Sequence, residues 1–319
     1  MELEIVIAII LLVLMGFIIL TYSVFIFIRP FVTVPKHRMV DGSKGNILTF
    51  TQFDSMKLNH KTNIPKLMFR TGEFYLDNIQ FQLNDLYEKT IKDNPGLKVI
   101  YFSDEDRRHF IKKYYPRYLK SYDLLIPGAY RADLFRILVL HKYGGVYMDM
   151  GMKSLVSLDK IIDWNKYDFI IPQDGYEFGT FSGVKNYALF NGFMASKPKN
   201  KLLMKIAEQI DMNIRNRQYG DSVWDITGPE VVGKVLNREL KRSEIHAYNE
   251  KYLDIGGIRI KVLKLKVDLL LNNAFIYEKN GNGNRLIQVK LALENKFGLE
   301  KKIKDYRIHW KNGEVFNEE

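Results

Sequence analysis

The stretch from Arg131 to Gly151 reads RADLFRILVLHKYGGVYMDMG. Between Leu134 and Leu140 the only polar residue is Arg136, so this segment predicts a helix that is buried nearly all round. Asp133 lies three residues before Arg136, so the two side chains share a face of that helix. The glycines at 144 and 145 end it. A helix that buries an acid and a base together is a candidate for a functional site.

A short strand is predicted directly after this helix, over Val146 to Met150. The alternation of a strand turns Tyr147 and Asp149 to the same face, opposite Met148. Asp149 therefore lies where the strand ends. Because ligands of open α/β sheets bind at the carboxyl ends of strands, Asp149 is a candidate site residue.

Strand-like and helical segments alternate through much of the chain. Runs of β-branched and aromatic residues predict strands within residues 64–72, at 98–102 and at 167–172. Ser103 is expected to cap the helix that follows the second of these strands, with Asp106 as its capping-box partner. This alternation predicts an α/β fold with a mostly parallel sheet and flanking helices.

The N-terminal region predicts a membrane anchor. Ile5 to Ile28 contains no charged residue and would span about 36 Å as a helix. Its acidic start, with Glu2 and Glu4, and the lack of a small-residue cleavage site favour a transmembrane helix over a cleaved signal peptide. We expect an anchor over residues 1–29, a stem over 30–63 and a single globular domain over 64–319. The basic residues that follow the span place this domain on the cytoplasmic side by the positive-inside rule.

Composition narrows the classes of function. The 319 residues include 46% hydrophobic residues, enough for a sizeable core. The absence of cysteine excludes disulfides, thiolate metal sites and a cysteine nucleophile. A net charge of +11 suits an anionic partner such as a lipid bilayer surface or a phosphorylated small molecule. No nucleic acid is expected as a partner, because basic runs interleaved with aromatic residues are missing.

The central stretch also carries a family resemblance. Its order of R-A-D-x-x-R, an apolar run and Y-G-G-x-Y-x-D resembles the DXD sugar-binding region of glycosyltransferase family 32, which contains fungal mannosyltransferases and viral and capsular enzymes. The resemblance implies a GT-A-like, Rossmann-type domain that transfers a hexose from a nucleotide sugar with retention of the anomeric configuration. The first donor to expect is GDP-mannose, and the alternative is a UDP-hexose. The resemblance implies a glycan, sphingolipid or protein acceptor. It also implies a Golgi or ER membrane location with the domain in the lumen, whereas the charges favour the cytoplasmic side.

Further segments resemble elements of the same family. Residues 64–72 resemble its opening strand, 189–198 its N-x-F-x-A-S-x-P segment and 306–310 its closing element. Thr227-Gly228-Pro229 resembles its T-G-P element, with Thr227 expected as a helix cap. Asp174 and Asn191 lie on loops that can reach an acceptor. The residues expected to bind donor or substrate are Phe69, Arg70, Thr71, Arg131, Tyr147, Asp174, Asn191, Gly192 and Trp310.

The motif departs from the family at its second acid, which is Gly151 here. The expected catalytic residues are Asp133, Arg136 and Asp149. A Mn²⁺ or Mg²⁺ ion would then depend on Asp149, the donor diphosphate and His309. A cationic clamp of Arg131, Arg136 or Lys153 can replace the ion, because guanidinium groups pair with phosphate. The alternative to an enzyme is an inactive member of the fold that serves as a scaffold or partner subunit.

Overall fold

The computed structural model describes residues 47–72, 90–174, 185–268, 273–278, 284–289 and 306–318. They belong to one compact unit that begins at Gly45. The transmembrane helix expected at residues 5–28 lies outside these ranges. Among the helices within them, none has both the length and the apolar character to cross a bilayer.

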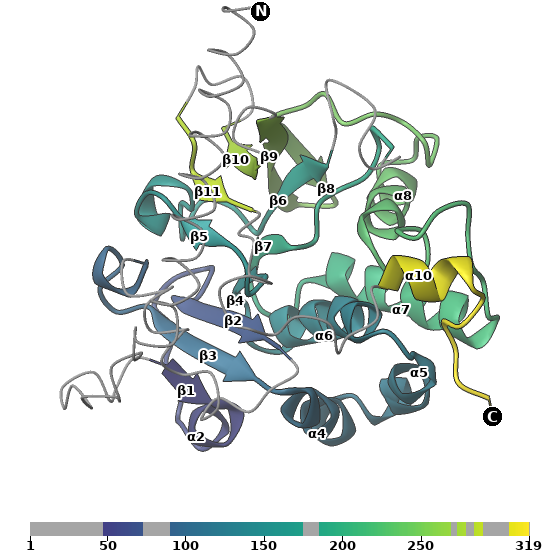
Figure 1. The fold of residues 1–319 in the computed structure, drawn as a ribbon. Helices are drawn as coiled ribbons and strands as arrows, with labels where there is room; N and C mark the ends of the chain where they lie inside the picture. Colours follow the sequence, from purple (N-terminus) through teal and green to yellow (C-terminus); the bar gives the residue numbers. More distant parts are fainter. Residues whose placement is uncertain are drawn as a thin grey trace, which may run out of the picture. The chain divides into compact units, whose positions relative to one another are not determined.

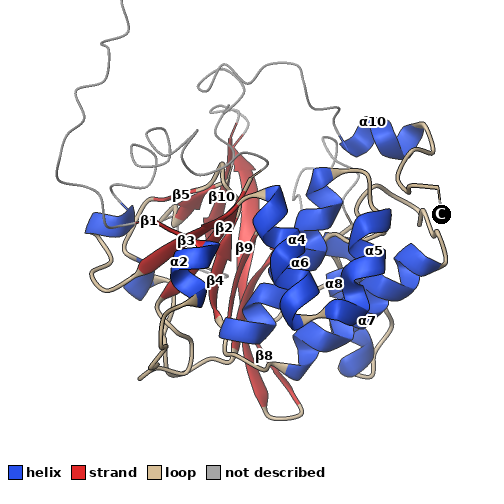
Figure 2. Ribbon diagram, turned by 90° about the horizontal axis from the view of Figure 1, so that it is seen from below, coloured by secondary structure: helices blue, strands red, loops and turns tan. Residues whose placement is uncertain are grey.

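A mixed sheet carries a layer of helices, α4 to α8, on one face (Figures 1 and 2). The strand order is β1-β3-β2-β4-β7-β6-β9-β10-β11-β5, and β8 pairs with β9. The strands are β1 (Ile47–Thr49), β2 (Leu67–Thr71), β3 (Lys98–Phe102), β4 (Gly145–Met148), β5 (Lys153–Ser154), β6 (Phe169–Asp174), β7 (Phe193–Ser196), β8 (Tyr252–Ile255), β9 (Ile258–Asp268), β10 (Asn273–Tyr277) and β11 (Ile287–Gln288). The helices are α2 (Phe50–Asp54), α4 (Asp104–Tyr114), α5 (Leu119–Leu124), α6 (Gly128–Tyr143), α7 (Lys201–Arg215), α8 (Pro229–Glu239) and α10 (Tyr306–Lys311).

The prediction of a mostly parallel sheet is wrong. The strands β1, β3, β2 and β4 are parallel to one another, and β6 is parallel to β9. However, β7 runs antiparallel to both of its neighbours, β4 and β6, and the pairings of β9 with β8 and β10 are also antiparallel. Only Gly256 and Gly257, at φ 58° and 81°, join β8 to β9. A connection this short permits an antiparallel hairpin and excludes a parallel crossover.

Helix α6 is buried as the sequence predicts. It packs against α4, α7, β2 and β4, and its residues Leu134 to Leu140 are all buried. Two glycines with positive φ then turn the chain into β4. A Cβ on Gly144 would come within 2.6 Å of the Pro198 ring, and a Cβ on Gly145 within 2.6 Å of Leu67 O. Only glycine can therefore bring the end of α6 this close to the sheet.

The compact unit includes residues that the sequence analysis assigned to the stem. Residues 47–54 form β1, which pairs with β3, and α2. The side chains of Phe50 and Phe53 are buried, and their rings contact Phe102 at 5.0 Å and Phe69 at 5.8 Å between centroids. These aromatic contacts attach the segment to the core, ahead of the expected boundary at Ile64.

Candidate active site

The carboxyl ends of β2, β3 and β4 meet at one edge of the sheet, because these strands are parallel neighbours. Asp149 directly follows β4 at that edge. Its backbone N–H donates to Gly192 O at 2.8 Å, and its backbone oxygen accepts from Arg70 Nη1 at 2.6 Å. These two bonds hold the chain at Asp149 between the end of β2 and the segment that enters β7.

Arg136 links two carboxylates at this edge. Its Nη1 lies 3.2 Å from Asp133 Oδ1, and its Nη2 lies 3.2 Å from Asp149 Oδ1. The guanidinium also lies over the Tyr147 ring, 4.6 Å from its centroid. The Tyr147 hydroxyl donates to Asp149 Oδ1 at 2.9 Å. The structure thus brings together the three residues that the sequence singled out for catalysis.

Asp133 is the buried end of this cluster. Asn191 Nδ2 donates to its Oδ1 at 3.0 Å, and the Thr227 hydroxyl donates to its Oδ2 at 2.7 Å. Burial raises the pKa of Asp133 to about 6, although Arg136 and the Thr227 hydrogen bond oppose that rise. Near neutral pH the carboxyl group is therefore mostly ionised, with all its partners supplied by the protein.

The electrostatics of the cluster favour a chemical role. Burial by itself lowers the pKa of Arg136, but the charges of Asp149 and Asp133 outweigh it and raise this pKa above its ordinary value. The side chain of Arg136 is 7% exposed, whereas that of Asp149 is 40% exposed and faces solvent. Burying an ion pair commonly costs as much free energy as it returns, and an apolar pair of the same volume would serve the core as well.

Two glycines have different consequences at this site. A Cβ on Gly192 would come within 2.4 Å of the Phe190 ring and 2.6 Å of Asp149 Oδ2, so any side chain there would displace the Asp149 carboxylate or the Phe190 ring. Gly151 is half-buried and supplies no side chain. Within the described ranges, no group of three or more histidine or acidic side chains is arranged to hold a metal ion. Asp149 is the carboxylate that this part of the sheet edge presents to solvent beside Gly192.

The predicted donor-binding residues of β2 differ in their surroundings. Phe69 is fully buried in the core, where its ring stacks on Tyr143 at 6.0 Å between centroids. The Thr71 hydroxyl donates to Phe102 O at 2.7 Å. Arg70 is fully buried and reaches under the Asp149 loop, where it also donates to Met152 O at 3.2 Å. Of these three side chains, Arg70 is the one that hydrogen-bonds to the backbone of Asp149.

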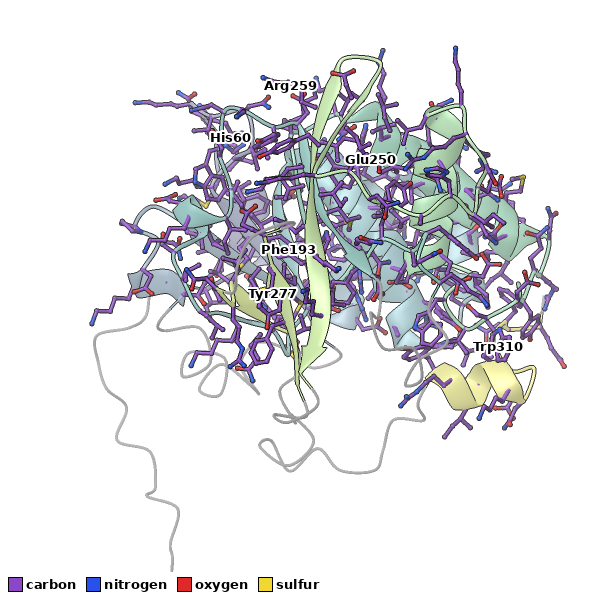
Figure 3. All side chains as sticks on the ribbon, turned by 90° about the horizontal axis from the view of Figure 1, so that it is seen from above. His60, Phe193, Glu250, Arg259, Tyr277 and Trp310 are labelled. Carbon is purple, nitrogen blue, oxygen red and sulfur yellow. The ribbon has the colours of Figure 1, made fainter. Side chains whose placement is uncertain are left out.

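The predicted residues near the C-terminus lie on α10. Trp310 Nε1 donates to Tyr219 O at 2.9 Å, and His309 Nδ1 lies 3.6 Å from Glu314 Oε2. Figure 3 shows Trp310 at the rim of the domain, apart from Phe193, the first residue of β7. The structure therefore places His309 beside Glu314, and its proposed part in a metal site with Asp149 stays a prediction.

Asp174, predicted on a loop, is the last residue of β6. It is buried, and burial together with the nearby Glu230 raises its pKa to about 7. Glu230 lies in the first turn of α8, where it accepts hydrogen bonds from the hydroxyls of Tyr187 and Ser222. A second pair of buried acids thus adjoins the segments that carry Asn191 and Thr227.

Thr227 is a site residue that the sequence analysis placed differently. The sequence predicts Thr227 as the cap of α8, but the N-cap residue in the structure is Gly228. The Thr227 hydroxyl donates to Asp133 instead. The resemblance of Thr227-Gly228-Pro229 to the family's T-G-P element was the signal that could have assigned it. Neither spacing nor periodicity distinguishes these two uses of a threonine before a helix.

Comparisons with known proteins agree with this geometry. Residues 81–168 match the model of the family described as a glycosyltransferase sugar-binding region containing a DXD motif. An uncharacterized glycosyltransferase of Acanthamoeba polyphaga mimivirus is 31% identical over 197 residues, which are 60% of this chain and 72% of that protein. The chain belongs to this glycosyltransferase family.

Two fungal relatives match over shorter parts of this chain. A mannosyl phosphorylinositol ceramide synthase of Saccharomyces cerevisiae is 32% identical over 53% of this chain and 39% of the relative. Inositol phosphoceramide mannosyltransferase 3 of Schizosaccharomyces pombe is 29% identical over 33% of this chain and 29% of the relative. The chain thus spans less than half the length of these two relatives. The solved structure of PaToxG glycosyltransferase is similar with a TM-score of 0.36 and 15% identity over 56% of this chain and 70% of that one.

Proposed function

We propose that this glycosyltransferase moves a hexose from a nucleotide sugar to a hydroxyl group of an acceptor, with retention at the anomeric carbon. The observation that carries the proposal is the chain of contacts from Asp133 through Arg136 to Asp149 at the carboxyl edge of the sheet. The names of the two fungal relatives make mannose the first sugar to test, with GDP-mannose as its donor and a UDP-hexose as the alternative.

The cluster suits the polar surface of a sugar. A hexose presents hydroxyls that both donate and accept hydrogen bonds. Asp133 and Asp149 are acceptors, whereas Asn191 Nδ2 and the Arg136 guanidinium are donors. In this proposal Asp149, Asn191 and Arg136 fix the sugar, and the buried Asp133 holds Asn191 and Arg136 in place. Tyr147 orients Asp149, and Thr227 orients Asp133. The positive charge of Arg136 also opposes the negative charge that develops as the bond to the diphosphate breaks.

A divalent cation fits this residue set only as an ion shared with the donor. Asp149 supplies one oxygen ligand, Gly151 supplies none, and Mg²⁺ or Mn²⁺ is commonly held by one or two carboxylates together with substrate phosphates. Asp149 is the residue that would hold the ion. When bound, the ion would neutralise charge on the leaving diphosphate.

The acceptor and the setting of the enzyme belong to the proposal as well. The printed names of the fungal relatives refer to inositol phosphoceramides, so a sphingolipid is the first acceptor to test, followed by a glycan and a protein. The predicted anchor over residues 1–29 would hold the enzyme at the membrane that contains such a lipid.

A donor panel tests the proposed function. The full chain in detergent is incubated with GDP-mannose, UDP-glucose and UDP-galactose, with Mn²⁺ or with a chelator, and nucleoside diphosphate release is followed. Release from one donor, lost in Asp149→Ala, supports the proposal. Asp123→Ala is the matched control, because the Asp123 side chain is 39% exposed and pairs with Arg108 on the surface. A folded chain that neither binds nor cleaves any donor would point to the scaffold alternative instead.

A further inference from the structure

Asp104 is a carboxylate at the sheet edge that the cluster described above does not use. It is the first residue of α4, separated from the end of β3 only by Ser103. The helix does not need it as a cap, because Ser103 and Asp106 form the capping box as predicted. Its side chain is nonetheless held in place and remains 40% exposed.

Three donors fix this carboxylate, and they leave one of its oxygens largely open. Oδ1 accepts from Arg107 Nη2 at 2.6 Å and from the Tyr122 hydroxyl at 3.0 Å. Oδ2 has one long contact among the described residues, with Arg131 Nη1 at 3.4 Å. A carboxylate oxygen accepts two hydrogen bonds, so Oδ1 is saturated and Oδ2 has spare capacity. An acceptor that is half exposed, rigid and unsaturated is ready for a ligand.

The charges around Asp104 are unbalanced. Arg107 and Arg131 share this one carboxylate, so the group of three carries a net positive charge. The side chain of Arg107 is only 3% exposed, and its buried Nε has no hydrogen-bond partner within the described part of the chain. A buried guanidinium with incomplete partners is costly. A ligand that offers hydroxyl donors would use the spare capacity of Asp104 Oδ2, and a negative group beside them would balance the net positive charge.

This group of three lies beside the candidate active site. β3 is two strands from β4 in the sheet, and the carboxyl ends of both lie at the same edge. Burial raises the pKa of Tyr147, and the charges of Arg136 and Arg107 both oppose the rise. The charge of Arg107 therefore acts on Tyr147, the residue that donates to Asp149. A ligand that reaches Asp149 can extend to Asp104.

A nucleotide sugar matches this division of charge. Its sugar would meet the acidic side of the edge, at the exposed Asp149, while its phosphates would be attracted to the surplus guanidinium of Arg131. Its ribose then supplies vicinal hydroxyls, which an acidic residue near a strand end binds in other nucleotide-binding α/β folds.

We propose that Asp104 accepts hydrogen bonds from the ribose hydroxyls of the donor nucleotide, and that Arg107 is the positioning residue that holds it. The proposal rests on the proposed function, since it assumes a nucleotide donor. It assigns the nucleoside to the end of β3.

Paired ribose and deoxyribose ligands test this assignment directly. The full chain is titrated with GDP, UDP and their 2′-deoxy forms, and the ratio of the two dissociation constants is measured for the nucleotide that binds. A hydrogen bond to a charged acceptor predicts about tenfold weaker binding of the deoxy form. In Asp104→Asn the acceptor is neutral and about half as strong, so the ratio is expected to fall to about threefold.

The controls separate recognition from folding. Asp123→Asn removes an acid of similar exposure from the surface and should keep the wild-type ratio. Arg107→Met should lower the ratio and Arg107→Lys should restore part of it, whereas a loss of folding would weaken both ligands alike. A wild-type ratio near one, or an unchanged ratio in Asp104→Asn, would overturn the proposal. If the wild type binds no nucleoside diphosphate at all, the proposed function fails too, so the two failures are distinguishable.

Discussion

Replacing Arg136 by methionine would isolate the central interaction of this site. The change keeps an unbranched side chain of similar length but removes the guanidinium that lies 3.2 Å from both Asp133 and Asp149. Asp149 is 40% exposed and can regain water, whereas Asp133 is buried and cannot. The main cost of Arg136→Met therefore falls on Asp133.

The loss of stability in Arg136→Met depends on pH, because the Asp133 carboxyl group titrates. Breaking a buried ion pair by removing one partner costs about 3–5 kcal/mol, and the exposure of Asp149 places this case near 3 kcal/mol at pH 8. At roughly 2–4 °C for each kcal/mol, the melting temperature should fall by about 6–12 °C. Asp133, whose pKa is about 6, is largely protonated at pH 5.5 in the wild type. The lost charge interaction then matters less, and about 1 kcal/mol should remain.

The direction of this pH dependence follows from the sign of the pKa shift of Asp133. The folded-state pKa of Asp133 is raised above that of the unfolded chain, so the stability associated with its protonation is present at low pH and is lost as the pH rises through about 6. Removing Arg136 takes away the cation that opposes this rise, so the variant should lose more stability than the wild type on going from pH 5.5 to pH 8.

Thermal unfolding followed by circular dichroism at pH 5.5 and pH 8 measures the effect. Arg108→Met is the control, because Arg108 pairs with Asp123 on the surface and its loss should cost at most about 1 kcal/mol at either pH. An equal loss for Arg136→Met at both pH values, or a greater loss at pH 5.5, would refute the account of a buried carboxylate held by one cation.

Three further predictions concern other parts of the site. Gly192→Ala places a Cβ within 2.6 Å of Asp149 Oδ2, so kcat/KM for the donor should fall at least tenfold, and steady-state kinetics beside a melting curve would separate this loss from misfolding. Asp174→Asn removes a carboxyl whose pKa is raised to about 7 by burial, so it should stabilise the protein by up to ~4 kcal/mol at pH 8.5 and by ~2 kcal/mol at pH 5.5, where the carboxyl of the unfolded chain is already ionised; a denaturant titration at both pH values that shows no difference would contradict this. Gly151→Asp restores the second acid of the motif, and Mn²⁺ should then stimulate donor cleavage about tenfold more than in the wild type; unchanged metal dependence would show that Asp149 does not work with a second ligand here.

Local sequence patterns predicted several elements well. The strand at residues 98–102, the cap at Ser103 and the buried helix that Gly144 ends all occur in the structure. Each depends on interactions within a few residues: alternation in a strand, a side chain that reaches the third N–H, or a glycine that adopts positive φ. Patterns of this range are visible in the sequence because no distant partner changes them.

The sequence-based predictions differed from the structure where residues distant in sequence determine the conformation. The reversal of β7 between β4 and β6 is fixed by pairing across the sheet, and the inclusion of residues 47–54 in the domain is fixed by aromatic contacts of Phe50 and Phe53 with the core. Thr227 occupies a position typical of a cap, yet its hydroxyl bonds to Asp133, 94 residues away in sequence.

The sequence by itself determined that Asp133 and Arg136 lie on one buried helix and that Asp149 lies at the end of the strand that follows it, because a glycine turn connects the two elements. Only the tertiary structure decided which groups form hydrogen bonds and ion pairs with these charged side chains. Asn191 and Thr227 reach Asp133 from two separate loops, Tyr147 orients Asp149, and Arg107 with Arg131 surrounds Asp104 from two helices. The physical reason is that burial and hydrogen bonding depend on every segment packed around a group, whereas periodicity records only the neighbours along one segment.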